Sequence, residues 1–271
     1  MSSQPNSAAK VTVRKLLQMK ADKEKIVCLT AYDVSFAKLL DAAGVDVVLV
    51  GDSLGMVMQG LDNTLAVTMD DMVYHSRCVA KGLERALLMV DMPFMSHITP
   101  QIALQNAGRL MKESAAHIVK LEGGSEQQEV VTALTSNGIP VCAHLGLQPQ
   151  RVHKLGGYRV QGREADRAER MLKEASILEQ AGADVLLLEC VPAALATKIT
   201  EAVSIPVIGI GAGTDVDGQI LVLQDILGIT PGRAPKFSKD FMQGADSIQT
   251  AIQNYVDAVK ARTFPQQEHI F

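Results

Sequence analysis

Along most of the chain, short and continuously apolar runs alternate with longer runs in which apolar residues recur every three or four positions. The short runs are typical of parallel strands covered on both faces, and the periodic runs are typical of amphipathic helices. The pattern predicts strands at residues 25–33, 45–53, 86–93, 117–124, 140–147, 184–190 and 205–213. Helices are predicted between the strands, with a long final helix over residues 238–262. Residues 218–229 are compatible with an eighth strand, a seventh helix, or parts of both.

This alternation continues without a domain break, and it predicts an α/β protein with a single-domain (β/α)8 TIM barrel. An open doubly wound sheet is the alternative, but no GxGxxG motif follows the first strand. The expected boundaries are a disordered N-terminal tail at 1–11, a catalytic barrel domain at 12–264 and a C-terminal tail at 265–271. Residues 147–163 form a polar insertion after the fifth strand. Its length and composition predict a substrate lid, with a plain surface loop as the alternative.

Composition narrows the classes of function. The 271 residues are 47% hydrophobic and 21% charged, as in ordinary globular proteins. A net charge of −4 argues against nucleic acid as a partner, because nucleic-acid binders carry a basic surface. The four cysteines have no CxxC spacing, which predicts free thiols in a reducing compartment. The N-terminal segment has no signal-peptide pattern, and no apolar run approaches the roughly 20 residues of a membrane span. We therefore expect a cytoplasmic protein that binds no membrane.

Ionisable side chains stand at the carboxyl ends of most predicted strands. They are Asp33, Asp52, Asp91, Lys120 with Glu122, His144 and Glu189. In a closed barrel all these ends meet at one face, where barrel enzymes keep their active sites. Any single aspartate at such a position could instead cap the following helix, but capping does not account for the whole set. The strand ends therefore predict a charged pocket.

The residue types in this pocket indicate its chemistry. Asp52, Asp91 and Glu122 offer hard oxygen ligands, with no cysteine and one histidine nearby, a set that suits Mg²⁺ better than zinc. Lys120 faces the same side of its strand as Glu122, either as an internal ion pair or as a cation for a substrate carboxylate or enolate. Glu189 lies among apolar residues, which makes it the candidate general base or acid. Together they predict metal-assisted removal of a proton next to a carbonyl.

Several segments resemble the ketopantoate hydroxymethyltransferase (3-methyl-2-oxobutanoate hydroxymethyltransferase) family. They are LTAYDVSFAKLLDAAGVDVVLVGDSLGMVMQG, DMPFMS, VKLEGG, VCAHLGL, GGYRVQGR, LLLECVP, IPVIGIGAG and PKF, and the likeness extends over roughly residues 12–264. The resemblance implies a barrel related to the phosphoenolpyruvate mutase/isocitrate lyase group. It also implies transfer of a hydroxymethyl group from 5,10-methylenetetrahydrofolate to 3-methyl-2-oxobutanoate (α-ketoisovalerate), giving 2-dehydropantoate (ketopantoate) in pantothenate and coenzyme A biosynthesis.

The same resemblance implies the roles of single residues. One Mg²⁺ per subunit would be held by three carboxylates, Asp52, Asp91 and Glu122. The keto acid would be contacted by Asp52, Ser53, Asp91, Lys120 and His144. Glu189 would be the proton acceptor. The resemblance also implies a cytoplasmic homodecamer, a pentamer of dimers.

Two other hypotheses about the function remain open. A lyase or mutase of the related barrel group would share the metal and enolate chemistry without a folate, but its lyase members carry a catalytic cysteine in a KKCGH-like stretch that this sequence lacks. A metal-binding scaffold without activity would not need a lysine, a base and a lid at one face. The residues alone do not indicate where a folate would bind.

Overall fold

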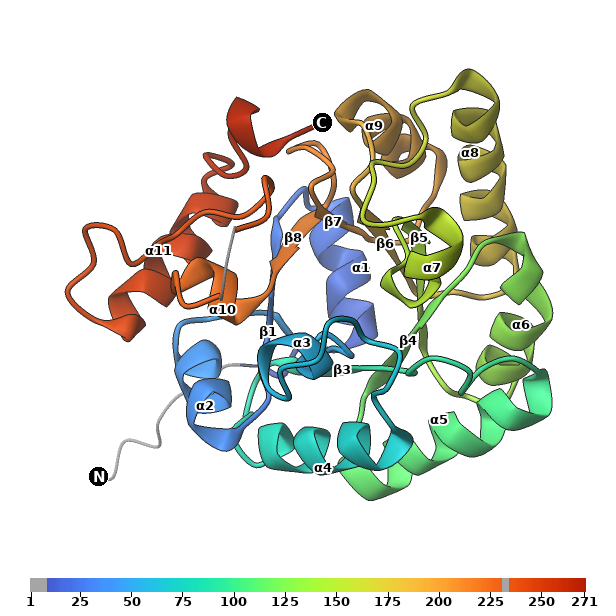
Figure 1. Ribbon diagram of the computed structural model, residues 1–271, viewed down its shortest axis with the longest axis horizontal. Coiled ribbons are helices and arrows are strands. Elements are labelled where there is room, and N and C mark those ends of the chain that lie inside the picture. The colour runs from blue at the N-terminus through green and yellow to red at the C-terminus, as the bar shows by residue number, and fades with distance from the viewer. Residues whose placement is uncertain (1–8, 231–233) are drawn as a thin grey trace.

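Eight parallel strands close into a barrel, and helices surround it (Figure 1). The computed structural model describes residues 9–230 and 234–271. Each strand pairs with the next, and the pairing of Ile26 with Gly218 and of Leu29 with Leu221 closes the ring between the first strand and the last. This confirms the predicted (β/α)8 barrel. The strands are β1 (Ile26–Thr30), β2 (Val47–Val50), β3 (Leu87–Asp91), β4 (Ile118–Glu122), β5 (Val141–Gly146), β6 (Val185–Glu189), β7 (Val207–Ile210) and β8 (Gly218–Leu221).

Several helices begin where the sequence offers a capping side chain. Asp33 accepts hydrogen bonds from the backbone N–H groups of Ser35 and Phe36, and Thr68 forms a reciprocal capping box with Asp71. The helices are α1 (Val13–Ala21), α2 (Val34–Ala42), α3 (Leu54–Val57), α4 (Met69–Ala80), α5 (Pro100–Ser114), α6 (Gln128–Ser136), α7 (Val152–Leu155), α8 (Ala165–Gln180), α9 (Ala193–Ala202), α10 (Leu223–Ile226) and α11 (Ile248–Lys260), with 3₁₀ turns η1 (Ser125–Gln127), η2 (Pro149–Arg151) and η3 (Gln267–His269). None of the helices in the described parts of the chain is long and apolar enough to cross a membrane.

The last third of the chain resolves one open point of the predicted pattern and departs from the pattern in one place. Residues 218–229 contain parts of both elements considered for them, the strand β8 and the helix α10. The final helix starts at Ile248 rather than near residue 238, because Gly244 has a left-handed φ of 83° and Ser247 caps the helix. The helix is fixed to the barrel by Tyr255, whose hydroxyl lies 3.0 Å from the Cys28 carbonyl oxygen of β1.

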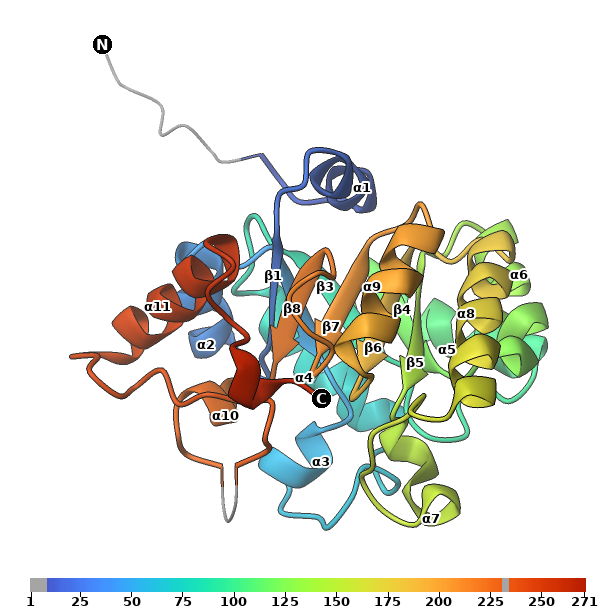
Figure 2. The same ribbon diagram turned by 90° about the horizontal axis from the view of Figure 1, so that it is seen from above.

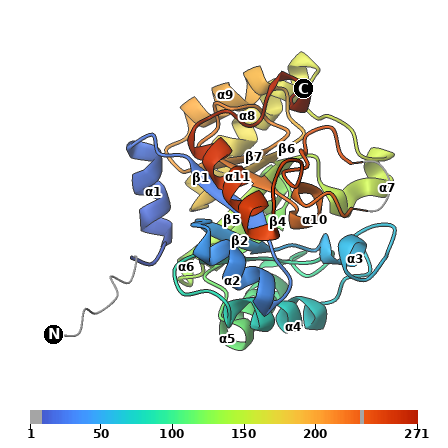
Figure 3. The same ribbon diagram turned by 90° about the vertical axis from the view of Figure 1, so that its left-hand side faces the viewer.

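The two ends of the barrel carry different groups. Figures 2 and 3 show α1 at one end and α3, α7 and α10 at the other. At the amino ends of the strands, buried Asp46 accepts a hydrogen bond from the Val27 N–H at 3.0 Å. Arg85 and Lys260 form ion pairs with the same carboxylate at 3.2 and 3.0 Å. This network, which we call the Asp46 network, joins β1, β2, β3 and α11 at the end of the barrel opposite to α3, α7 and α10.

Two segments outside the strand–helix units pack against the carboxyl end of the barrel. The insertion at 147–163 contains η2 and α7. Residues 265–271, for which the sequence predicts a tail, contain η3, and the Ala193 N–H donates to the Phe271 carbonyl oxygen at 3.1 Å. Most of the predicted N-terminal tail, residues 1–8, lies outside the described residues.

Candidate active site

A cavity of about 590 Å³ opens at the carboxyl ends of the strands. It is lined by every residue to which the sequence assigns a role: Asp52, Ser53, Asp91, Lys120, Glu122, His144 and Glu189. Asp33 does not belong to this set, since its carboxylate caps α2. The structure thus brings the seven side chains together, and their individual roles stay predictions.

Strand register brings the charged groups into contact. Asp91 on β3 pairs with Lys120 on β4, and the Lys120 ammonium lies 2.7 Å from one Asp91 oxygen. The other Asp91 oxygen accepts a hydrogen bond from the Asp52 N–H at 3.0 Å. Glu122 pairs in turn with His144 on β5. The carboxylate of Asp91 therefore fixes the loop after β2 against the lysine of β4.

The charges around the cavity do not balance. At its inner end, four buried or half-buried carboxyl groups, on Asp52, Asp91, Glu122 and Glu189, lie around the Lys120 ammonium, whereas the other cations of the described lining, Arg159 and Lys236, are exposed. Burial and the charge of Asp91 raise the pKa of Asp52 to about 7. Burial and Asp52 likewise raise the pKa of Glu122 well above its usual value. Burial by itself would lower the pKa of Lys120, but the surrounding carboxylates raise it above its usual value.

This excess of carboxylates fits a hard divalent cation. Within the described ranges, no three histidine, cysteine, aspartate or glutamate side chains are arranged to hold a metal by themselves. Magnesium does not require such a set, because it keeps several waters and binds one or two carboxylates together with substrate oxygens. Asp52 and Asp91 supply two adjacent carboxylates of this kind. The chemistry of the donor set thus agrees with the predicted magnesium site and leaves coordination positions for water and substrate.

His144 lies between two carboxyl groups. Its Nε2 is 3.3 Å from a Glu189 oxygen, and its Nδ1 is 3.8 Å from a Glu122 oxygen. Neither ring nitrogen has a hydrogen-bond partner among the described residues. Burial, together with the charge of Lys120, lowers the pKa of His144 well below its usual value, so the ring is neutral. Burial also raises the pKa of Glu189 to about 7. Glu189 can therefore exchange a proton near neutral pH.

Gln150, in η2 of the insertion, belongs to the site although the sequence gave no reason to select it. Its side-chain amide donates to Asp52 at 2.8 Å and to the Met92 carbonyl oxygen at 3.0 Å. Its backbone N–H donates to Glu122 at 3.1 Å. A glutamine in a polar loop carries no local pattern, and its position just after the fifth strand was the only available signal. Gln150 connects the insertion to the carboxylates of two strands.

A second residue outside the predicted set holds Ser53. The hydroxyl of Tyr32, just after β1, lies 2.7 Å from the Ser53 hydroxyl. Ser53 itself makes no capping hydrogen bond to α3, although it precedes that helix. Its hydroxyl is therefore oriented by a buried tyrosine and remains in the wall of the cavity.

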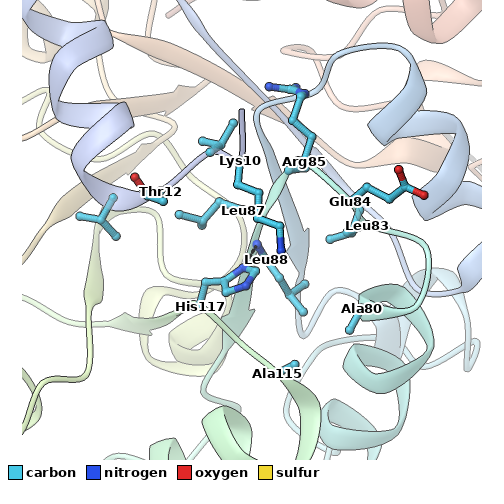
Figure 4. A pocket seen from close by; sticks show the side chains of 13 residues that line it. Lys10, Thr12, Ala80, Leu83, Glu84, Arg85, Leu87, Leu88, Ala115 and His117 are labelled. Carbon is cyan, nitrogen blue, oxygen red and sulfur yellow. Dashed lines mark hydrogen bonds between the residues drawn. The ribbon is translucent and has the colours of Figure 1, made fainter. Parts of the chain in front are cut away.

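Another cavity, of about 380 Å³, lies at the opposite end of the barrel beside the start of β3 (Figure 4). Its lining is largely apolar, and its ionisable residues are Lys10, Glu84, Arg85 and His117. Arg85 is already engaged by Asp46, and the His117 ring accepts a hydrogen bond from the Leu88 N–H at 2.9 Å. This cavity has no cluster of carboxylates, so we assign the chemistry to the cavity at the carboxyl ends.

Comparisons with known proteins show the family of the chain. The ketopantoate hydroxymethyltransferase family model matches residues 10–267. The chain is 62% identical over 267 residues to a 3-methyl-2-oxobutanoate hydroxymethyltransferase of Alkalilimnicola ehrlichii, covering 98% of this chain and 96% of the relative. It is 60% identical over 259 residues to the enzyme of the same name from Nitrosococcus oceani, covering 96% and 98%.

Solved structures with much lower identity share the fold. A phosphonopyruvate hydrolase in complex with oxalate and Mg²⁺ superposes with a TM-score of 0.62 at 14% identity, covering 92% of this chain and 98% of the other. A phosphoenolpyruvate phosphomutase from Streptomyces platensis gives 0.61 at 13% identity, covering 80% and 83%. At these identities the likeness concerns the barrel alone.

Proposed function

Since the chain belongs to the ketopantoate hydroxymethyltransferase family, we infer that it is a 3-methyl-2-oxobutanoate hydroxymethyltransferase, which forms ketopantoate in pantothenate biosynthesis. We propose 5,10-methylenetetrahydrofolate as the one-carbon donor and Mg²⁺ as the metal. The observation that carries the proposal is the convergence of a lysine, paired carboxylates and a glutamate with a raised pKa on one cavity.

One Mg²⁺ per subunit would be held by Asp52 and Asp91, with Glu122 beside it. The excess of carboxylates over ammonium groups around the cavity supports this assignment. When bound, the cation would draw electron density from the keto-acid carbonyl and make the neighbouring C3–H bond more acidic. Lys120 would supply a fixed positive charge for the keto-acid oxygens, and Ser53 would donate a hydrogen bond from a hydroxyl oriented by Tyr32.

Glu189 is the proposed base. Its carboxylate takes the C3 proton, and the electron pair of the C–H bond moves toward the carbonyl oxygen to give an enolate. One water hydrolyses the methylene bridge of the folate, releasing tetrahydrofolate and one carbon at the oxidation level of formaldehyde. The enolate C3 bonds to that carbon, and the proton held by Glu189 passes to the new alkoxide. His144, neutral and 3.3 Å from Glu189, would orient the carboxylate.

The remaining assignments rest on the family. We propose a cytoplasmic homodecamer, a pentamer of dimers, whose catalytic unit is the barrel domain at 12–264. The keto acid and the folate are its proposed small-molecule partners.

Proton exchange in D₂O tests the reaction. With Mg²⁺ and no folate, the protein should replace the C3 proton of 3-methyl-2-oxobutanoate with deuterium, as followed by proton NMR. Asp52→Ala and Asp91→Ala should abolish exchange and Mg²⁺ binding while circular dichroism shows a retained fold. A wild-type protein that exchanges no proton would contradict the proposed chemistry.

Asp33→Ala is the matched control, because it removes an aspartate at another strand end. It should cost about 0.5–2 kcal/mol of stability through the lost cap and leave exchange and Mg²⁺ affinity unchanged.

A further inference from the structure

The cavity is larger than a five-carbon keto acid needs, and its lining divides into two parts. The inner part holds the four carboxyl groups, Lys120 and His144. The outer part is mainly apolar, with Met56, Tyr158, Phe237 and Phe271 among its lining residues. The whole cavity, at about 590 Å³, falls within the roughly 300–1,000 Å³ that proteins use for larger organic ligands. If the proposed function holds, the outer part is the space left for the folate.

Asp225 is the single acidic residue among the described residues of the outer part. It lies in α10, just after β8, and is 6% exposed. The Thr230 hydroxyl donates to one of its oxygens at 2.5 Å, and no other described residue donates a hydrogen bond to its carboxyl group. The four inner carboxyl groups influence one another, whereas the pKa of Asp225 is raised by burial and offset by Thr230. A buried carboxyl group with one partner is costly unless a ligand completes its hydrogen bonds.

We propose that the outer part of the cavity binds the reduced pteridine ring of the folate, with Asp225 accepting hydrogen bonds from its 2-amino group and the adjacent N3–H. These two donors are parallel, and a carboxylate accepts such a pair in the same way as it accepts a guanidinium. Thr230 positions the carboxylate by its hydrogen bond. The faces of the ring pack against apolar side chains such as Tyr158, Met56 and Phe237.

The mouth of this subsite carries positive charge. Arg159 and Lys236 both line the cavity and are exposed. The Lys236 ammonium donates to the Ile270 carbonyl oxygen at 2.6 Å and lies 4.8 Å from the centre of the Phe271 ring. The C-terminal segment thus holds one cation beside the opening. These two cations can bind the glutamate carboxylates of the folate, because the glutamate tail must extend out of the cavity when the pteridine is buried.

The experiment compares tetrahydrofolate and 6-methyltetrahydropterin binding by calorimetry in the wild type and in Asp225→Asn. The amide keeps the shape but presents an N–H₂ group to the donors of the ring. Affinity for both probes should fall roughly ten- to hundredfold, as expected for lost hydrogen bonds to a charged group. Deuterium exchange of the keto acid should stay at the wild-type rate. Wild-type affinity for either probe in the variant would overturn the assignment of Asp225.

Two further variants serve as a matched control and as a substitute for Asp225→Asn. Asp184→Asn is the matched control, because Asp184 is a part-buried aspartate before β6 that also accepts one hydrogen bond, from the Val141 N–H at 2.9 Å. It should leave both affinities unchanged. If Asp225→Asn does not fold, as shown by circular dichroism, Tyr158→Ala replaces it, since Tyr158 is 50% exposed. Unchanged tetrahydrofolate affinity in Tyr158→Ala would overturn the subsite.

Failure of the proposed function has a different signature. If the proposed function is wrong, the wild-type protein will show neither proton exchange nor hydroxymethyl transfer. If only the subsite is wrong, the wild type will show both activities, and the variants will bind the two probes as tightly as the wild type does.

Discussion

At the scale of single residues, the carboxyl groups around one cavity are given different tasks by their surroundings. Asp91 is occupied on both oxygens, by Lys120 and by the Asp52 N–H. Asp52 accepts a hydrogen bond from the side-chain amide of Gln150. Glu189 ends a strand of buried leucines and lies 3.3 Å from the neutral ring of His144. Asp52 and Asp91, which are held by hydrogen-bond donors, are placed to bind a cation. Glu189, which is poorly solvated, is placed to transfer a proton.

The replacement Glu189→Gln separates these tasks. Magnesium and keto-acid binding should remain nearly unchanged, because the variant keeps the shape and leaves Asp52, Asp91 and Lys120 in place. Exchange of the C3 proton should slow by roughly 10²–10⁴-fold, the usual effect of losing a general base. Calorimetric titration and NMR exchange on the same sample measure the two quantities. Weakened binding with a normal exchange rate at saturation would identify Glu189 as an ion-pair partner and make His144 the next candidate base.

The same residue predicts a pH profile. A base acts in its deprotonated form, and the pKa of Glu189 is about 7. At saturating Mg²⁺ and keto acid, the exchange rate should therefore rise with pH up to about 7 and level off above it. The residual rate of Glu189→Gln should lack this inflection. A rate that is flat from about pH 5.5 to 8.5 in the wild type would argue against Glu189 as the base.

At the scale of elements, the insertion after β5 is tied to the chemistry through its 3₁₀ turn. Gln150 reaches Asp52, Glu122 and the Met92 carbonyl from η2. Farther along, the Tyr158 hydroxyl lies 3.7 Å from the sulfur of Met56 in α3. A segment anchored at its start and lightly held near its tip can open without disturbing the barrel.

Loss of this anchor should loosen the segment. In Gln150→Ala, tryptic cleavage at Lys154 or Arg159 should become several-fold faster, and Mg²⁺ affinity should fall roughly tenfold because Asp52 loses a hydrogen bond that fixes it. Gln148→Ala is the control, because Gln148 is similarly buried, at 9% against 6% exposure, and no described residue hydrogen-bonds its side chain. Equal cleavage rates in the two variants would mean that Gln150 does not anchor the insertion.

The elements also explain what the sequence could and could not predict. The strand ends were predictable, because a closed barrel brings them to one face and residues two apart share one side of a strand. Asp33 and Asp52 look alike in the sequence, yet Asp33 caps α2 whereas the turn after Asp52 leaves its carboxylate in the cavity. Gln150 contacts the carboxylates of Asp52 and Glu122, which are distant in sequence, and Asp225 is singled out by its place in the lining of the cavity; local pattern carries no information about either. The start of α11 depended on the left-handed backbone of Gly244.

At the scale of the whole molecule, the charge of the site makes stability depend on pH. Asp52 and Glu189 have folded-state pKa values near 7, above their ordinary values of 3.8 and 4.5. The folded protein therefore binds more protons than the unfolded chain between about pH 4 and 7, and metal-free stability should fall as pH rises through this range. Each unit of raised pKa costs about 1.4 kcal/mol once the group is ionised.

Magnesium should offset this cost where the carboxylates are charged. Thermal unfolding in EDTA and in excess Mg²⁺ should show a shift in Tm of several degrees at pH 8 and a much smaller one at about pH 5.5. Asp52→Asn, which removes one charge and one ligand, should reduce the shift at pH 8. A Mg²⁺ effect of equal size at both pH values would contradict this account of the site.

The Asp46 network has a consequence for how this enzyme could be altered. It secures β1, β2, β3 and α11 at the amino ends of the strands, while the reacting groups stand at the carboxyl ends. Substitutions near Asp46 can therefore be selected for heat resistance without changing the groups that meet substrate, and the loops at the other end can be varied for new keto acids. In a directed-evolution programme, the two properties could be improved in separate libraries and then combined, because sites this far apart contribute almost independently.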